Sequence, residues 1–503
     1  MPTPESPEAG GIDRLIAERR EKLAGIRDEG VDPFPHSYPD RTPITDAREA
    51  NEGLESGDTG SRSVRVAGRI TGRRGQGKVI FMDLVDRSGK IQLWASLDAL
   101  GEERLATLGD LDLGDIIGAE GPVSRTRRGE LSIAVSDFTL LAKTLRPPPD
   151  KHHGLKDPEL RYRQRYLDLM ANDDARDLFI TRAKAISGVR RFLDERGFIE
   201  VETPVLQPLY GGAAARPFVT HHNALDRDFY LRIATELYLK RCIVGGLEKV
   251  YELGKDFRNE GISFKHNPEF TMLETYEAFA DYRDVMEMLE GMVSQAAIQA
   301  CGQTRVPWGE DGEIELGAPW TRLTFADAIN DASGIDIREH REARDLRDAM
   351  RAKDYEAGDD TSWPKLVDSL LGQSLEPDLI QPTILYDYPL ALSPFAKRHQ
   401  EDPDLVERFE AFCGGMEIAN AFTELNDPDD QRLRFEMAAE ELAAGDDEAQ
   451  PHDEDFLTAL EHGMPPTGGL GLGIDRLTML LTNRSSIREV VLFPARREGP
   501  EPL

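Results

Sequence analysis

The first apolar pattern of the chain follows the period of an α-helix. Apolar residues at Ile12, Leu15, Ile16, Leu23 and Ile26 recur among charged neighbours on roughly one stripe, as expected for an amphipathic helix. A turn-rich segment with several prolines, aspartates and glycines follows up to residue 60. We therefore expect residues 1–62 to form a helical leader.

From Val64 to about Leu145, the pattern changes to the alternation that is typical of short β-strands. The runs are SVRVAGRI, VIFMDLVD, KIQLWAS, IIGAEGPVSRT and ELSIAVSDFTLLA, with Gly-containing turns at Ser88-Gly89 and Arg128-Gly129. Five short strands match a small Greek-key barrel of the OB-fold kind. The proline string after Arg146 indicates a boundary, so we expect an OB-fold β-barrel domain over residues 63–147.

The remaining residues, 148–503, mix long helices with strands. DARDLFITRAKAISGVRRFLDERGF predicts an amphipathic helix ending at Gly197, and YLRIATELYLKRCIVGG passes from strand to helix. FRNEG, PEFTMLETYEAF, PTILYDYP and GGMEIANAFTEL predict strands. Because regular βαβ alternation is absent, we expect an α+β fold built on an antiparallel sheet flanked by helices. Within it, residues 335–380 predict a helical insertion and Gly445–Asp455 a solvated acidic loop.

The charge of the chain is strongly acidic, with one local reversal. The formal net charge is −32 and the sequence pI is about 4.8, which argues against nonspecific nucleic-acid binding. Residues 61–92 nevertheless hold eight Lys and Arg against two Asp, and a second basic stretch runs from Arg125 to Arg165. A basic N-terminal domain in an otherwise acidic protein is consistent with a polyanion that binds at this domain only. The alternative is an ordinary solvated charged surface.

Several classes of protein are excluded by what the chain lacks. No uncharged apolar run approaches the roughly 18 residues of a membrane-spanning helix, and MPTPESPEAGGID lacks the basic region and apolar core of a secretory signal. The three cysteines, Cys242, Cys301 and Cys413, are isolated, which argues against a disulfide framework or a Cys-based zinc site. We expect a cytoplasmic protein with reduced thiols.

The first block of candidate chemistry is FRNE followed by KHNPEF. Two strands joined by a basic loop would place Arg258 and Glu260 on one face. Arg258 offers a planar fork for phosphate or carboxylate, His266 a further donor and Phe270 a surface on which a base can stack. A lone Arg-x-Glu is usually a surface ion pair, whereas this ordered combination is more specific.

The second block is GGLGLGIDR, residues 468–476. A dinucleotide-binding loop is excluded because the spacing is not G-x-G-x-x-G and no βαβ unit surrounds the block. Glycines instead let a strand pass close to a ligand, and the helix that begins there presents Arg476 to a phosphate.

The third group consists of carboxylates and their strand neighbours. Period-2 alternation puts Asn420, Phe422 and Glu424 on one face, and it pairs Glu274 with Tyr276 in the same way. Glu410 lies seven residues before Glu417. Converging carboxylates indicate either Mg²⁺ coordination or recognition of a cation, and the alternative for each single residue is a salt-bridged glutamate.

Together these blocks resemble the signature motifs of class II aminoacyl-tRNA synthetases: FIEVETPVL with Pro204, FRNE with HNPEF, and GLGIDR. Within that class, the chain resembles the bacterial-type lysyl-tRNA synthetases. The supporting stretches are RYRQRYLDL, GGAAARPF, ATELYLKR, SPFAK, EIANAFTELND and MPPTGGLGLGIDRL, which cover most of 145–503. The segment Tyr386–Leu392 and His462 depart from the common pattern of the family without touching its motif positions.

The resemblance implies a two-step reaction and its partners. L-Lysine and ATP give lysyl-adenylate and pyrophosphate, and the lysyl group then passes to the 3′-terminal adenosine of tRNA(Lys). Mg²⁺ is the implied metal ion, and Pro204 with its preceding helix implies a homodimer. The expected partners are therefore tRNA(Lys), lysine, ATP and a second copy of the chain, without a membrane.

The resemblance also assigns roles to individual residues. Arg258 holds the α-phosphate and the substrate carboxylate, Glu260 and Phe270 hold the adenine, His266 and Arg476 hold the distal phosphates, and Asn267 completes the ATP site. Arg258 and Arg476 are the catalytic residues, and Glu410 and Glu417 bind Mg²⁺, Glu410 also belonging to the ATP site. Gly212, Glu236, Glu274, Tyr276, Asn420, Phe422 and Glu424 line the lysine pocket. The residues agree with this assignment, because three carboxylates suit a substrate with two ammonium groups.

In the barrel, related proteins stack anticodon bases on an aromatic side chain and read base edges with polar groups. Phe81, Gln92 and Glu130 occupy the matching positions, although Phe81 could instead be a core residue of the barrel. One rival function is a related enzyme that attaches lysine-like groups to a translation factor, but such enzymes lack the barrel. Another is a catalytically inactive RNA-binding paralogue, against which the retention of Arg258, Glu410, Glu417 and Arg476 argues.

Overall fold

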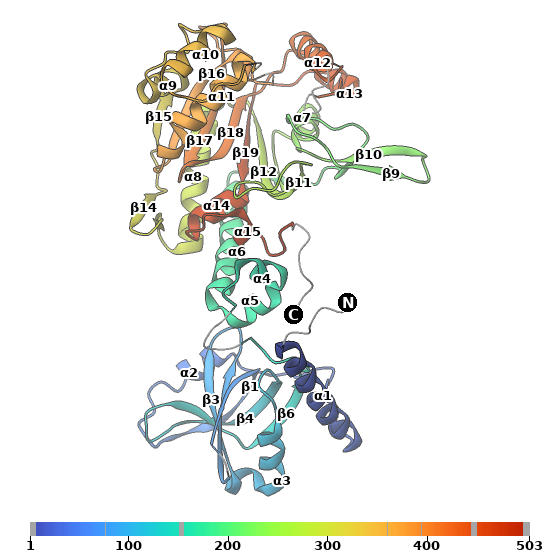
Figure 1. Ribbon diagram of the computed structural model, residues 1–503, viewed down its shortest axis with the longest axis vertical. Helices are drawn as coiled ribbons and strands as arrows, with labels where there is room; N and C mark the ends of the chain where they lie inside the picture. The colour runs from blue at the N-terminus through green and yellow to red at the C-terminus, as the bar shows by residue number, and fades with distance from the viewer. Residues whose placement is uncertain are drawn as a thin grey trace. The chain divides into compact units, whose positions relative to one another are not determined.

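The chain forms two compact units, each described here by itself. The computed structural model describes residues 7–75, 77–149, 155–359, 361–393, 395–443 and 450–495. One unit comprises Met1–Arg161 with Tyr166–Asn172, and the other comprises Tyr162–Arg165 with Asp173–Leu503 (Figure 1). The domain limits expected from the sequence, 1–62, 63–147 and 148–503, stay a prediction.

The first unit contains the predicted OB-fold barrel. Its strands are β1 (Thr59–Arg74), β2 (Val79–Val85), β3 (Lys90–Ser96), β4 (Ile116–Arg125), β5 (Leu131–Ala134) and β6 (Asp137–Ala142). β1 pairs with both β2 and β4, and this double pairing closes the sheet. The predicted fifth strand is divided at Val135 and Ser136, so that β5 pairs with β3 and β4 while β6 pairs with β4. The five-stranded barrel is confirmed, with its last strand in two pieces.

Three helices accompany the barrel: α1 (Pro7–Asp28), α2 (Ile44–Glu49) and α3 (Leu97–Asp110). The predicted N-terminal helix is confirmed by α1. The helix α3 was not expected, and its sequence explains this, since Gly101 with φ +75° interrupts the helical backbone. β1 begins at Thr59, inside the segment that was expected to be leader.

One charged cluster lies within this unit. The Lys143 side chain is buried, and its ammonium Nζ lies 2.6 Å from Asp112 Oδ2 and 3.0 Å from Asp115 Oδ2. Asp115 also accepts hydrogen bonds from the backbone N–H of Asp112 and from the N–H and hydroxyl of Thr144, at 2.8–2.9 Å. Lys22 adds a further contact to Asp112 at 3.0 Å. The carboxylates of both aspartates therefore have hydrogen-bond or ion-pair partners within this unit.

The second unit is built on an eight-stranded sheet in the order β15-β16-β17-β18-β19-β12-β11-β7. The strands are β7 (Ile199–Glu200), β11 (Lys249–Phe257), β12 (Glu269–Ala278), β15 (Thr321–Thr324), β16 (Thr383–Pro389), β17 (Leu405–Cys413), β18 (Met416–Thr423) and β19 (Thr467–Gly473). The six central strands are antiparallel, and only the outer pairs β15–β16 and β7–β11 are parallel. The predicted antiparallel sheet is confirmed.

Helices cover this sheet on both sides and at its ends. They are α6 (Asp173–Asp194), α7 (Glu236–Val244), α8 (Tyr282–Cys301), α9 (Phe325–Ser333), α10 (Ala343–Ala352), α11 (Trp363–Ser374), α12 (Pro428–Ala443), α13 (Glu454–Glu461), α14 (Ile474–Leu481) and α15 (Ile487–Val490), with 3₁₀ turns at Glu376–Asp378 and Leu390–Leu392. Val189 of α6 and Leu289 of α8 pack with Phe409 and Ile418 in one core, and α9 and α11 form another against Leu385. The predicted helix before Gly197 is confirmed, and the expected insertion 335–380 is helical.

The smaller elements complete the two units. They are α4 (Pro158–Arg163), α5 (Arg165–Ala171), the sheet β8 (Leu206–Gln207), β10 (Arg227–Leu231) and β9 (Val219–His222), and the hairpin β13 (Arg305–Trp308) with β14 (Gly312–Glu315). Figure 1 shows β9 and β10 projecting from the second unit. No helix among the described residues is long and apolar enough to cross a membrane, and all three cysteines are free thiols.

Two local predictions are wrong. The segment FRNEG is not a strand, because β11 ends at Phe257 and the next four residues form a loop whose backbone bonds to Pro268 and Arg216 instead of to a neighbouring strand. The acidic stretch 445–455 is not a solvated loop throughout its described part. Glu454 and Asp455 are exposed, but they begin α13, and other residues of the stretch are buried. Asp453 is 9% exposed and caps α13 by accepting from the N–H of Phe456 at 2.9 Å, and Gln450 is also buried; residues 445–449 lie outside the described residues.

Candidate active site

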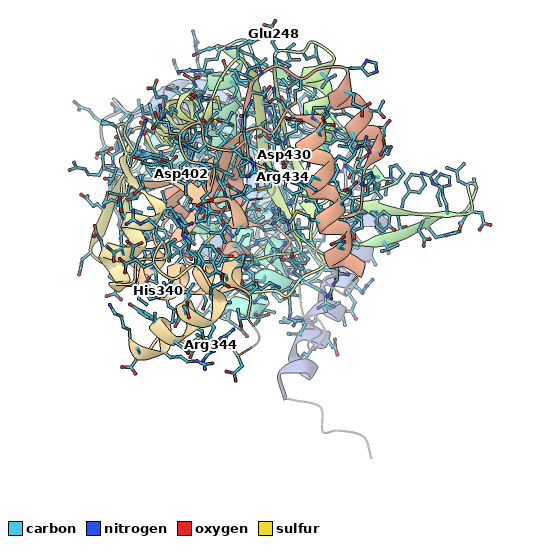
Figure 2. The ribbon with its side chains drawn as sticks, turned by 90° about the horizontal axis from the view of Figure 1, so that it is seen from above. Glu248, His340, Arg344, Asp402, Asp430 and Arg434 are labelled. Atoms are coloured by element: carbon cyan, nitrogen blue, oxygen red, sulfur yellow. The ribbon has the colours of Figure 1, made fainter. Side chains whose placement is uncertain are left out.

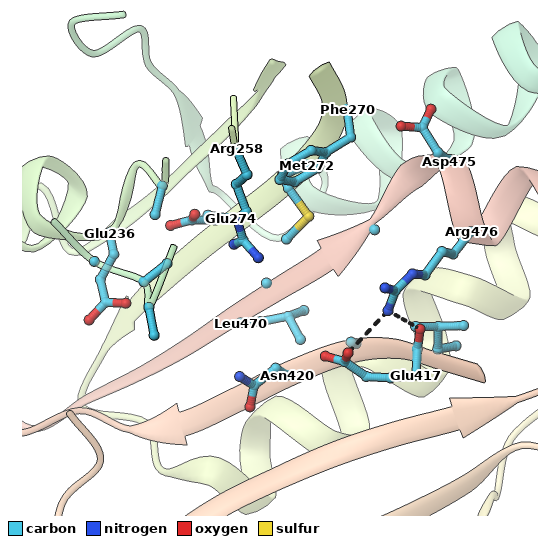
Figure 3. Close-up of a pocket in the computed structure, with 18 of the residues that line it drawn as sticks. Glu236, Arg258, Phe270, Met272, Glu274, Glu417, Asn420, Leu470, Asp475 and Arg476 are labelled. Carbon is cyan, nitrogen blue, oxygen red and sulfur yellow. Dashed lines mark hydrogen bonds and ion pairs between the residues drawn. The ribbon is translucent and has the colours of Figure 1, made fainter. Parts of the chain in front are cut away.

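A cavity of about 430 Å³ opens over β12, β18 and β19, next to α7 and the loop that follows β11. Most of the predicted site residues line it (Figure 3). They are Gly212, Glu236, Arg258, Glu260, His266, Asn267, Phe270, Glu274, Tyr276, Glu417, Asn420, Phe422, Glu424 and Arg476. Residues that are far apart in the sequence thus meet in one place, and among the residues predicted for the lysine, ATP and metal sites Glu410 is the exception.

The glycine strand β19 forms the floor of this cavity. It lies between β12 and β18, where Gly469 is opposite both Tyr276 and Phe422. A Cβ atom at Gly469 would collide with Glu424 Oε1 and would lie 2.7 Å from the Tyr276 ring. Only glycine leaves room for these side chains, which confirms that this strand approaches the site closely.

One end of the cavity is acidic. Glu274 accepts hydrogen bonds from the backbone N–H of Thr235 at 3.1 Å and from the Tyr276 hydroxyl at 3.3 Å. Burial, with added repulsion from Asp256 and Glu236, raises the pKa of Glu274 to about 8. Burial raises the pKa of Glu424 as well, against the opposing charge of a neighbouring lysine. Because these carboxylates are buried away from water, binding of a cation beside them is favoured.

That neighbouring lysine, Lys240 on α7, was missed by the sequence analysis. Its side chain is fully buried, with the ammonium 2.6 Å from Glu236 Oε1 and in an ion pair with Glu424 Oε2. Burial opposes its charge, but the two carboxylates raise the pKa of Lys240 above its ordinary value. A Glu and a Lys four residues apart usually form an exposed helical pair, so the sequence carried no signal for a buried one.

The backbone at Gly212 closes the acidic end. Gly212 has φ +88°, and a Cβ there would lie 3.0 Å from the Glu236 Cβ and 3.1 Å from the Ala234 Cβ. Its N–H donates to the side-chain oxygen of Gln450 at 3.0 Å. Gln450, from the stretch expected to be solvated, therefore holds a residue of the predicted lysine pocket.

A helix on the rim fixes a further lining segment. Arg434 of α12 pairs with Asp430 one turn earlier, at 2.7 Å, and donates to the carbonyl of Ala396 at 2.8 Å (Figure 2). The neighbouring Ser393 and Phe395 line the cavity, whereas Pro394 of the SPFAK motif lies outside the described residues.

The cavity also carries arginines, with Arg258 drawn between Glu274 and Arg476 in Figure 3. Arg258 lies in a loop fixed by its N–H donating to the carbonyl of Pro268 at 2.9 Å, and its guanidinium lies 5.1 Å from the centre of the Phe270 ring. His266 Nδ1 lies 2.9 Å from the Ser263 hydroxyl, and burial together with Arg476 lowers its pKa. This part of the cavity is suited to an anion that carries a planar ring.

Arg476 stands in the first turn of α14, as the glycine block predicted. It donates to the backbone carbonyl of Glu417 at 2.6 Å and to Glu417 Oε2 at 3.0 Å (Figure 3). The preceding residue, Asp475, accepts from the N–H of Thr271 at 2.8 Å and pairs with Arg182 at 2.6 Å. The start of the helix is thereby tied to β12 and α6.

Glu410 does not line the cavity. It lies on β17 opposite Asn420, where its carboxylate accepts from the Tyr388 hydroxyl at 2.9 Å and pairs with Arg408. Burial, despite Arg408 and with repulsion from Glu417, raises the pKa of Glu410 to about 7. Both predicted metal carboxylates thus have an arginine partner, and no three His, Cys, Asp or Glu side chains of the described residues form a metal cluster.

The three anticodon candidates share one face of the barrel. Phe81 is half-buried, lies outside the barrel core and is opposite Trp94 on β3. Gln92 accepts from the Ser132 hydroxyl at 3.0 Å, and the exposed Glu130 precedes Ser132 by two residues. The core position considered for Phe81 is wrong, and Trp94 is a second aromatic on this face that the sequence analysis missed.

Comparison with known proteins agrees with both units. Residues 157–497 match the family of class II tRNA synthetases (D, K and N), and residues 64–141 match the OB-fold nucleic acid binding domain family. The chain belongs to the class II tRNA synthetases.

Its relatives narrow the family further. The chain is 51% identical over 490 residues to a lysine–tRNA ligase of Clostridium tetani, covering 97% of this chain and 96% of the relative. It is 52% identical over 487 residues to a lysine–tRNA ligase of Moorella thermoacetica, covering 97% and 98%, and 52% identical to one of Dehalococcoides mccartyi, covering 96% and 97%. Within its class, the chain belongs with the lysine–tRNA ligases.

Proposed function

We propose that this chain ligates lysine to tRNA(Lys) in two steps. Lysine and ATP form lysyl-adenylate and pyrophosphate, and the lysyl group then moves to the 3′-terminal adenosine. The observation that carries the proposal is the lining of one cavity, which brings the carboxylates of Glu236, Glu274 and Glu424 together with the guanidinium groups of Arg258 and Arg476. A substrate with two ammonium groups and a carboxylate can be aligned there with a nucleotide.

The first step is the attack of the lysine carboxylate on the α-phosphate of ATP. This attack needs no strong base, because the nucleophile is already an anion, so alignment and charge stabilisation provide the catalysis. Arg258 holds the carboxylate and the α-phosphate together, and Arg476 with His266 binds the distal phosphates. Phe270 stacks on the adenine, which Glu260 and Asn267 hold by hydrogen bonds.

Mg²⁺ is the metal ion that the family implies. Glu410 and Glu417 are hard oxygen donors, and two carboxylates suit Mg²⁺, which usually takes only one or two from the protein. When bound, the ion neutralises charge on the phosphate oxygens. Glu417 and Glu410 would hold the ion. Glu417 now contacts Arg476, which would become available to phosphate, and Glu410 is held by Arg408 and Tyr388.

Lysine occupies the acidic end. Glu274 and Glu424 face the ε-ammonium, and Gly212, Glu236, Tyr276, Asn420 and Phe422 complete the pocket. An aspartate substrate would be repelled there, because like charges in a desolvated site are costly.

The barrel supplies the contact with the tRNA anticodon. Phe81 stacks on a base, while Gln92 and Glu130 bind base edges. Arg62, Lys78 and Arg87 are exposed and, within the described part of the chain, make none of the side-chain hydrogen bonds that Arg65 and Arg69 make to the barrel. They meet the phosphates.

A second copy of the chain covers the surface around Pro204. Ile199, Val205, Leu206 and Val219 are each at least 42% exposed, and such a group of apolar side chains favours burial against a partner. The homodimer is tested by sedimentation of the full chain. A cytoplasmic location follows from the substrates, ATP and tRNA, and from the free thiols.

Lysine-dependent exchange between ATP and pyrophosphate tests the proposed function. We expect exchange that requires lysine and Mg²⁺ and that is followed by charging of tRNA(Lys). Exchange without tRNA charging, with transfer to a protein instead, would favour the translation-factor enzyme. Absence of exchange with retained tRNA binding would favour the inactive paralogue.

A further inference from the structure

The acidic end of the cavity already contains one ammonium group. Lys240 reaches it from α7, and none of its side chain is exposed. Its Nζ contacts Oε1 of Glu236 and Oε2 of Glu424. The second oxygen of each carboxylate is therefore left for another partner, and both residues line the cavity.

The charges at this end can be counted. When ionised, Glu236, Glu274 and Glu424 carry three negative charges, and Lys240 supplies one positive charge. Asp256, which also repels Glu274, is paired with Arg232 at 3.2 Å and is left out of the count. Two negative charges remain, which equal the two ammonium groups of lysine. The lysine carboxylate lies outside this count, because Arg258 is its partner in the proposed function.

Lys240 also fixes where the carboxylates stand. Glu236 and Glu424 come from α7 and from the end of β18, which are far apart in the sequence, and one ammonium holds them both. Glu424 fits only because position 469 has no side chain. Without the ammonium, two buried carboxylates would face each other and would be expected to take up protons or move apart.

We propose that Lys240 is a specificity-determining positioning residue, a fixed counter-cation that orients Glu236 and Glu424 and sets the pocket to accept a substrate with two ammonium groups. This inference rests on the proposed function and deepens it. Lys240 contacts the two carboxylates and acts on the substrate through them, so its loss affects lysine and leaves ATP bound as before.

The test is Lys240→Met in the full chain, which removes the charge and nearly preserves the shape. We expect the lysine KM in ATP–pyrophosphate exchange to rise at least about 10-fold, because the lysine pocket loses affinity for its substrate. The ATP KM should stay within about twofold of wild type. Lys240→Gln keeps two N–H donors without the charge, and it takes the place of the methionine variant if that variant does not fold. An unchanged lysine KM in either folded variant overturns the proposal.

The matched control is Lys249→Met. Lys249 on β11 pairs with Glu277 at 2.6 Å, outside the cavity, and its side chain is 37% exposed. It undergoes the same substitution and loses an ion pair of similar length. We expect the lysine KM of this variant to equal that of wild type. An equal rise of the lysine KM in both variants would mean that the effect comes from lost protein stability, and it would overturn the role of Lys240.

Chemical rescue separates charge from packing. Lys240→Ala removes a propylammonium group, so added propylammonium should lower the raised lysine KM, whereas neutral n-propanol of the same shape should not. Wild-type enzyme with propylammonium controls for competition with lysine. Equal rescue by n-propanol means that Lys240 only fills space, which overturns the proposal.

Failure of this inference is distinguishable from failure of the proposed function. If wild-type protein shows no lysine-dependent exchange, the proposed function is wrong. If wild-type protein is active and the Lys240 variants keep its lysine KM, the function stands and the inference is wrong.

Discussion

Two lysines of this chain are buried between carboxylates, Lys143 in the barrel and Lys240 in the cavity. In the barrel, Asp115 receives three further hydrogen bonds besides the ammonium, and Asp112 has Lys22 as a second cation. In the cavity, Lys240 is the only partner of the Glu424 carboxylate among the described residues. The carboxylates around Lys143 thus have further partners in the free protein, whereas Glu424 beside Lys240 has room for another partner.

The pKa values follow this difference. In the barrel, burial opposes ionisation, but hydrogen bonds from Lys143 and Lys22 hold the pKa of Asp112 below its ordinary value. In the cavity, burial dominates and raises the pKa of Glu274 to about 8. A cluster whose carboxylates all have partners in the free protein stabilises the fold. A cluster in which the carboxylates outnumber their one cation can bind a further cation.

The largest expected effect is that of Glu274→Gln in the cavity. The lysine KM should rise by about two to four orders of magnitude, since leaving a buried charge unpaired costs about 3–5 kcal/mol, and the ATP KM should change little. Exchange kinetics with lysine and ATP varied separately measure both. Asp115→Asn in the barrel is the counterpart and should leave the lysine KM unchanged. Wild-type-like lysine activation in Glu274→Gln would remove this residue from the site.

Lys143→Met should break the cluster in the barrel. Asp115 would remain buried without its cation, while Asp112 would keep Lys22, and an unpaired buried charge costs about 3–5 kcal/mol of unfolding free energy. Denaturant and thermal unfolding of the full chain measure the loss, and lysine-dependent exchange at low temperature should persist. The comparison fails if this variant keeps its melting temperature but loses lysine activation.

The barrel offers a second contrast, between two phenylalanines. Phe81 is half-buried on the outer face, whereas Phe138 is 4% exposed in the core. Phe81→Ala should reduce tRNA charging about 5- to 150-fold, as expected when about 1–3 kcal/mol of base stacking is lost, without changing the melting temperature or the exchange reaction. Phe138→Ala should instead cost about 3–5 kcal/mol of stability. A lower melting temperature with unaltered charging in Phe81→Ala would exclude the stacking role.

Local patterns predicted much of this architecture. The period of β18 placed Asn420, Phe422 and Glu424 on one face, and the glycines of β19 predicted a close approach, because both depend on backbone geometry that neighbouring residues determine. The loop at Arg258 was mistaken for a strand because its partners, Arg216 and Pro268, come from other segments.

Contacts across the sheet could not be predicted in this way. Arg408 pairs with Glu410 two residues along β17, and Tyr388 bonds to the same carboxylate from β16, so the metal carboxylate has partners that spacing alone does not reveal. Lys240 follows Glu236 at helical spacing, yet its burial depends on Glu424 from a distant strand. Burial depends on the whole fold, and it determines whether a charged residue stabilises or destabilises the folded protein.

The last expected effect, which needs no substitution, is a pH dependence that belongs to the cavity alone. Below its pKa of about 8, Glu274 is protonated and neutral, so binding an ammonium requires loss of that proton, and lysine affinity should improve by up to about tenfold per pH unit from pH 6 to 8 and then level off. The free protein binds more protons at this carboxyl than the unfolded chain does, so this group's contribution to stability falls as pH rises through the same window. Added lysine should therefore raise the melting temperature more at pH 8 than at pH 6. Calorimetry in buffers of different ionisation enthalpy measures the proton release directly, and Glu274→Gln should reduce it, leaving the share of Glu424, whose pKa is raised as well. A lysine dissociation constant that is flat between pH 6 and 8 would mean that Glu274 is already ionised in the free protein, and that the cluster in the cavity is as well compensated as the one in the barrel.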